Sequence, residues 1–199
     1  MRAYYLIVII LLTQLTGCMG VVMKKSEDQT IPTLDQSKSR LVVMRSSLHG
    51  AVVPALMYEI IDEKPQFIAV LNNNEKIFVD TTPGQHTFMS LGVNVRFLIA
   101  NMTAGKTYYA MASPRGWPGV NFNLNPFLHS GSTEFILESD KFKSWLDSTA
   151  LMEITPEAIE WAKSREGLLN TRFPVEWPLW NEKPEDFKLQ FTLAPGDGL

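Results

Sequence analysis

Few residues in the sequence have side chains that could carry out chemistry, and they are widely spaced. The three histidines, His49, His86 and His129, are 37 and 43 residues apart, so none shows the short spacing of metal ligands. We expect His86, which follows a Pro-Gly turn, to make structural hydrogen bonds. The chain contains no G-x-S-x-G motif, which would present a serine nucleophile. The residues therefore predict no metal site, no cofactor and no assembled catalytic site.

One stretch is similar to the end of a phosphate-binding loop. It reads Ala104-Gly105-Lys106-Thr107, but the full motif needs a glycine five residues before Gly105, where Ala100 stands. A helix should also follow, so that its N-terminus can hold the phosphate. Residues 108–111 favour a strand instead, and the stretch is predicted to be a turn.

The single cysteine, Cys18, has a more specific chemistry. It follows a basic start at Arg2 and a run of nine apolar or aromatic residues, Tyr4–Leu12. That run is too short to cross a membrane, which takes about 20 residues, and it has the length of the apolar part of a secretory signal. Residues 15–18, Leu-Thr-Gly-Cys, resemble the bacterial lipobox, whose cysteine is acylated. Residues 1–17 are therefore predicted to be a lipoprotein signal peptide. The alternatives are an ordinary cleaved signal with an incidental cysteine, or a short uncleaved anchor.

Lipidation at Cys18 would place the protein at a membrane and make that membrane one of its partners. Two or three acyl chains such as palmitate anchor a protein stably, whereas one holds it marginally. Met19 rather than aspartate follows the cysteine, which is typical of lipoproteins on the periplasmic face of the Gram-negative outer membrane. Residues 18–39 are predicted to be a flexible tether, with 21–23 as the one place for an edge strand. A net charge of −3 argues against a nucleic-acid partner.

The chain from residue 40 onward is predicted to form short strands separated by turns. Parallel neighbours would need crossovers of a dozen or more residues, and none fits between these runs. Residues 40–138 are therefore predicted to form an antiparallel β-sandwich, with strands at Leu41–Arg45, Ala55–Ile61, Phe67–Leu71, Lys76–Asp80, Gln85–Leu91, Asn94–Ala100, Lys106–Ala112 and Thr133–Glu138.

Two segments of this region resemble signatures of small bacterial envelope β-domains. They are residues 79–88, with Pro83-Gly84-Gln85-His86, and residues 104–110, which read Ala-Gly-Lys-Thr-Tyr-Tyr-Ala. The chain is similar to PEGA-like and carboxypeptidase-regulatory-like sandwiches and to an uncharacterised lipoprotein domain family. The resemblance implies an Ig-like sandwich and supplies no catalytic residue. Where those families have Asp/Asn-Gly, this chain has Asp62-Glu63-Lys64-Pro65, which disfavours a type I′ hairpin.

Residues 139–199 are predicted to be a helical and irregular extension packed on the sandwich. Ser139 can cap one helix, and Thr155, followed by proline, can cap a second that ends at Gly167. The apolar face of the second helix, Ala158, Ile159, Trp161 and Ala162, is expected to lie on the sheet. Residues 171–180 contain too many prolines for a regular helix. Residues 181–199 combine a helix start at 184–186 with strand-like alternation at 187–193.

A connection of about twenty residues contains the candidate binding residues Trp117, Phe122 and Phe127. Long ordered loops often bind ligands. Because the protein is predicted to lie in the cell envelope, the expected partner is an envelope protein or a glycan. The alternative is that Trp117 folds back over the end of the sandwich. Trp177 and Trp180 are expected to pack within the tail.

The function predicted from these features is that of a lipid-anchored envelope lipoprotein, a non-enzymatic binding or scaffolding module. One alternative is a hydrolase or transferase that acts on cell-wall material through His129 and a distant carboxylate. Another is a structural subunit of an envelope complex.

Cys18 is predicted to be the acylated first residue of the mature chain. Mass spectrometry of the membrane fraction should find an N-terminal peptide that begins at Cys18 and carries acyl chains. The Cys18→Ser variant should leave that fraction. An unmodified N-terminus elsewhere, or identical soluble behaviour of both proteins, would contradict this prediction.

Overall fold

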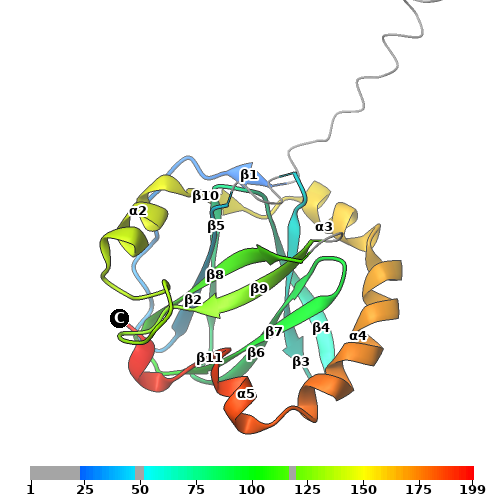
Figure 1. Ribbon diagram of the computed structural model, residues 1–199. Helices are drawn as coiled ribbons and strands as arrows, with labels where there is room; N and C mark the ends of the chain where they lie inside the picture. The colour runs from blue at the N-terminus through cyan, green and yellow to red at the C-terminus, as the bar shows by residue number, and fades with distance from the viewer. Residues whose placement is uncertain (1–22, 48–51, 117–119) are drawn as a thin grey trace, which may run out of the picture.

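The computed structural model describes residues 23–47, 52–116 and 120–199, and within these ranges the strands form two sheets packed face to face (Figure 1). The first sheet has the order β1-β10-β5-β2-β8-β9, with β1 (Lys24–Lys25), β10 (Ala150–Glu153), β5 (Glu75–Thr81), β2 (Ser39–Arg45), β8 (Thr107–Arg115) and β9 (Asn121–Pro126). The second has the order β11-β7-β6-β3-β4, with β11 (Thr192–Leu193), β7 (Val95–Met102), β6 (Gly84–Leu91), β3 (Ala55–Ile61) and β4 (Lys64–Leu71).

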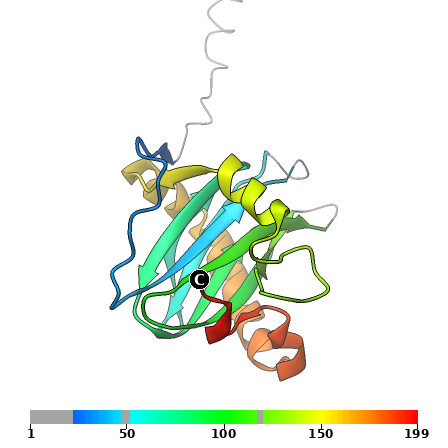
Figure 2. The ribbon, with the colours of Figure 1, turned by 90° about the vertical axis from the view of Figure 1, so that its left-hand side faces the viewer.

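Helices cover the outer faces of both sheets. Figure 2 shows α2 in front of the first sheet and the long helix α4 behind the second. A short 3₁₀ turn, η1, ends the chain. The helical bounds are α2 (Asp140–Ser148), α3 (Pro156–Lys163), α4 (Glu166–Asn181), α5 (Glu185–Leu189) and η1 (Pro195–Asp197).

Three apolar clusters form the core, because both faces of each sheet are covered. The first lies between the sheets and includes Leu41, Phe88 and Leu98. The second joins the outer face of the second sheet to α3 and α4, and the third joins the outer face of the first sheet to α2. All seven residues of β2 are buried. Strands that are buried on one face alternate between apolar and polar residues. These strands are buried on both faces, so that alternation is weak in this sequence.

The predicted β-sandwich with a packed helical segment is confirmed, but its strands are not all antiparallel. Three pairs, β2–β8, β5–β10 and β7–β11, are parallel. A parallel β2–β8 pair requires a long connection between its two strands. The chain between β2 and β8 provides it, because this part of the sequence forms most of the second sheet. The predicted strand Thr133–Glu138 is wrong: this segment forms turns, with one isolated bridge between Leu128 and Ile136.

The segments on either side of the predicted sandwich belong to the same body. Residues 23–39, expected within a tether, lie against it, since Met23 is buried and β1 pairs with β10. The C-terminal region, expected as an extension, contributes β10 to the first sheet and β11 to the second. Residues 40–138 alone would lack both strands.

A two-residue turn joins β3 to β4. Ile61 pairs with Lys64, and both residues between them have positive φ, +50° at Asp62 and +59° at Glu63. These are the signs of a type I′ turn, so the expectation that this sequence disfavours such a hairpin is wrong. The left-handed conformation of Glu63 costs about 1 kcal/mol or more, which the pairing of β3 with β4 offsets.

The predicted helix starts are confirmed, and two predicted helix limits are wrong. The hydroxyl oxygens of Ser139 and Thr155 accept from the amides of Phe142 and Ala158. The helix that begins after Thr155 ends at Lys163, and Gly167 lies inside α4. The proline-rich stretch 171–180 is also part of α4.

Trp161 of α3 contacts both the inter-sheet cluster and the cluster under α4. The Trp161→Ala variant should therefore lose about 2–3 kcal/mol of unfolding free energy, measured by urea denaturation. Ile159→Ala is the matched control, because Ile159, expected on the packed face, is 41% exposed and should change stability by less than about 1 kcal/mol. Equal losses in both variants would contradict this account of α3.

Candidate functional site

The structure does not gather the sequence-predicted binding residues on an exposed loop. Phe122 lies in β9 and Phe127 follows it, and both side chains are fully buried. The expected twenty-residue connection is largely strand, because β9 pairs with β8 through six residue pairs. Cys18 and Trp117 lie outside the described residues, and so does His49.

The two described histidines have different environments. The Nδ1 atom of His86 is 2.6 Å from Oε1 of Glu59, and its Nε2 atom is 2.8 Å from the carbonyl oxygen of Thr82. Both ring nitrogens therefore face acceptors, which confirms the predicted structural role of His86. His129 is exposed, and no hydrogen bond to a carboxylate is found for it within the described ranges.

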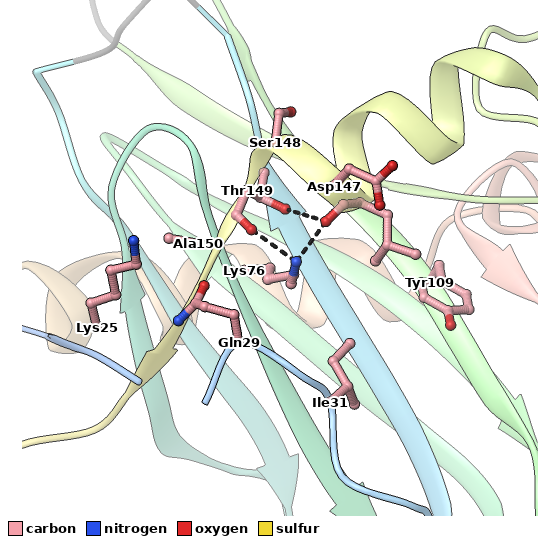
Figure 3. Close-up of a pocket in the computed structure, with 10 residues that line it drawn as sticks. Lys25, Gln29, Ile31, Lys76, Tyr109, Asp147, Ser148, Thr149 and Ala150 are labelled. Carbon is pink, nitrogen blue, oxygen red and sulfur yellow. Dashed lines mark hydrogen bonds between the residues drawn. The ribbon is translucent and has the colours of Figure 1, made fainter. Parts of the chain in front are cut away.

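A cavity of about 630 Å³ lies at the C-terminal end of α2 (Figure 3). The amine of Lys76 donates to the carbonyl of Leu146 at 2.5 Å and to that of Thr149 at 2.8 Å. Only 6% of Lys76 is exposed, and this desolvation lowers the pKa of its amine. These contacts satisfy carbonyls that the end of a helix leaves without partners, and they place a cation at the negative end of the helix dipole.

Gln29, a second polar residue of this cavity, is also paired within the chain. The amide of Gln29 donates to the carbonyl of Leu151 at 3.2 Å and accepts from its N–H at 2.8 Å. Gln29 thus continues the pairing of the edge strand beyond β1. Lys76 and Gln29 therefore have structural roles in this cavity.

A second cavity, the α4–α5 groove, lies between these helices and the ends of strands from both sheets. Its volume is about 640 Å³, within the range of small-molecule sites. The groove is lined by Val95, Arg96, Phe97, Arg115, Asn123, Glu176, Leu179, Trp180, Lys183, Phe187 and Phe191.

Two prolines shape the helix that forms one wall of this groove. Pro174 and Pro178 lie inside α4, four residues apart, and both are exposed. Each proline lacks an N–H donor, so the carbonyl four residues earlier has no partner within the helix. Because both prolines are on the exposed side of α4, water can bind these carbonyls. In Figure 1, α4 curves around the second sheet. Tertiary contacts of Leu169 and Trp180 with that sheet hold a helix that its sequence disfavours.

The floor of the groove is a connected set of aromatic rings. The ring centroid of Phe97 lies 5.3 Å from that of Trp180, and the Trp180 centroid lies 6.3 Å from Phe187 and 6.2 Å from Phe191. Phe97 and Trp180 are buried, whereas Phe187 is 37% exposed. The apolar surface therefore continues from the core outward into the groove.

Three cationic side chains stand around this floor. Arg96 comes from β7, Arg115 from the end of β8, and Lys183 from the link between α4 and α5. None of them forms an ion pair with a carboxylate among the described residues. Glu176 is the one acidic residue in the lining, so the groove is locally cationic although the chain carries a net charge of −3.

Sequence reasoning missed this groove because it treated residues 171–180 as an irregular tail. Trp180 does pack, as expected, but from a helix and at the groove floor. The available signal was the spacing of Phe173, Trp177 and Trp180, at i, i+4 and i+7, which is typical of one helix face.

In the described ranges, no cluster of three or more metal-ligating side chains occurs. No helix among these residues is long and apolar enough to span a membrane. Comparison with protein-family models found no match, and a search of curated proteins likewise found none.

The His86–Glu59 contact predicts a pH-dependent contribution to stability. The hydrogen bond that the His86 ring donates to the Glu59 carboxylate raises the pKa of His86 above its ordinary 6.5. This contribution is therefore fully present below pH 6.5 and is lost as the pH rises through the higher folded-state pKa.

The unfolding free energy of the wild type relative to Glu59→Gln, measured in urea at pH 6 and pH 9, tests this. The wild type should be favoured more strongly over Glu59→Gln at pH 6 than at pH 9, because only the protonated ring gains from the carboxylate. A difference between the two proteins that stays constant over this range would contradict the pairing.

Proposed function

We propose that the protein is a lipid-anchored, non-enzymatic binding module of the bacterial envelope and that the α4–α5 groove holds its ligand. The observation that carries this proposal is the groove itself, where an aromatic floor meets three cations that form no ion pair with a carboxylate of the described chain. A concave apolar surface with a few convergent polar groups is the usual form of a ligand site. The anchor rests on the Cys18 motif alone, and the resemblance to PEGA-like domains stays a prediction.

The histidine geometry supports a binding role over the hydrolase alternative. A His-dependent hydrolase needs one ring nitrogen held by a carboxylate and the other free for the reacting group. His129 is exposed without a carboxylate contact among the described residues, and His86 uses both nitrogens within the chain. The binding interpretation requires neither histidine.

The start of the described chain and the groove lie at opposite ends of the protein, which supports a groove that faces away from the membrane anchor. The described chain begins at Met23, beside β1 and β10, whereas α5 lies at the opposite end (Figures 1 and 2). A protein anchored through residue 18 would therefore carry the α5 end, with its groove, toward the periplasm.

In-cell photo-crosslinking tests the proposal on the full-length chain. A photoreactive residue at Leu179, which lines the groove and is 49% exposed, should give one adduct of discrete mass. The matched control is Val175, one turn earlier on α4 and 58% exposed, which does not line the groove. No adduct at Leu179, or equal adducts at both positions, would overturn the groove as the binding site.

A further inference from the structure

We infer that the ligand of the α4–α5 groove is an anionic single-chain amphiphile, a hydrocarbon chain that ends in a carboxylate or a phosphate. This inference rests on the proposed function, since it names the ligand class of the same groove. It follows from three features of the lining: its ring geometry, its charge, and the strand edges beside it.

The ring geometry suits a hydrocarbon chain. The interplanar angle is 34° between Phe97 and Trp180, 67° between Trp180 and Phe187, and 52° between Phe187 and Phe191. Rings tilted in this way offer no pair of parallel faces that would hold a planar ligand by stacking. An alkyl chain has no such directional requirement, and each methylene removed from water contributes about 0.8 kcal/mol. Leu179 adds aliphatic surface at the helix wall.

The charge of the lining selects an anionic head group. Arg96 and Arg115 are contributed by strands of different sheets, and Lys183 by the helical side. Arg96 donates to the carbonyl of Val95 at 2.8 Å, which leaves most of its five donors available. A guanidinium binds a carboxylate or a phosphate through two parallel hydrogen bonds. Glu176 offsets one of the three positive charges, so the lining keeps a net positive charge.

The neighbouring strand edges favour a small amphiphile over a peptide that would add a strand. The edge of β7 is already paired with β11 at Ile99 and Ala100. On β9, the carbonyl of Phe122 accepts from the hydroxyl of Ser90, and the side-chain oxygen of Asn121 accepts from the amide of Asn94. A strand-adding peptide depends on free main-chain groups along an edge, and at Ile99, Ala100 and Phe122 such groups near the groove are already engaged.

Binding of dodecyl probes to the purified chain tests the inference, with calorimetry and tryptophan fluorescence as readouts. Dodecanoate and dodecyl phosphate, both below their micellar concentrations, should bind at least about tenfold more tightly than uncharged dodecyl maltoside or cationic dodecyltrimethylammonium. A chain brominated near its methyl end should quench tryptophan fluorescence, because Trp180 forms part of the floor.

Matched variants separate the head group from the chain. Arg96→Gln and Arg115→Gln should each weaken dodecanoate binding about tenfold, which equals about 1.4 kcal/mol, and leave maltoside binding unchanged. Phe187→Ala should weaken binding of both probes. Lys143→Gln, at an exposed position on α2 outside the groove, is the charge-matched control. Unchanged melting temperatures confirm that these variants fold.

The outcomes distinguish this inference from the proposed function. Equal binding of all head groups, or anion binding that the arginine variants do not change, overturns the amphiphile as the ligand. A peptide adduct at Leu179 in cells, with no dodecyl probe bound, also overturns the amphiphile but keeps the binding module. No adduct in cells together with no probe bound overturns both.

Discussion

The structure depends on one constraint: both sheets are apolar on both faces, so each needs a cover on its outer side as well as its inner side. Strand β2 shows this most clearly, since Leu41 and Val43 face the second sheet while Val42 and Met44 face α2. Burial of apolar surface is the main favourable term in folding. The sandwich of residues 40–138 would leave much of that surface in water, and the C-terminal helices and strands are therefore part of the same folding unit.

Covering the sheets brings polar groups into the interior, and the buried cations Arg45 and Lys76 have partners there. Arg45, at the end of β2, is fully buried; its guanidinium donates to the carbonyl of Leu71 at 2.6 Å and lies 4.5 Å from the ring centroid of Phe122. Desolvation lowers its pKa to about 10, so it stays charged at neutral pH. Lys76 has a similar role at the end of α2. Since an unpaired buried charge is costly, these contacts help to fix how the two sheets and their helical covers meet.

The groove arises where the cover of the second sheet changes direction. Helix α4 follows the sheet as far as Trp180, and the chain then turns through α5 before β11 joins the edge of β7. Trp177 and Trp180 of α4 pack on Phe97 of the sheet. Phe187, which follows in α5, extends this set of rings outward and is partly exposed. Arginines that end up beside this surface have few competing acidic groups. Packing and ligand recognition can therefore use the same aromatic side chains.

The features that local chemistry controls could be predicted from the sequence. Turn residues marked most of the strands, and Ser139 and Thr155 marked two helix starts, because caps and turns are satisfied within a few residues. Three other features could not be predicted in this way: the parallel pairing of β2 with β8, the helix through Pro174 and Pro178, and the burial of Phe122 and Phe127. Each of these depends on contacts between residues far apart in the chain, whose energy outweighs local preference. The groove belongs to the second group: Arg96, Arg115 and Trp180 come together only because two sheets and a bent helix end at the same place.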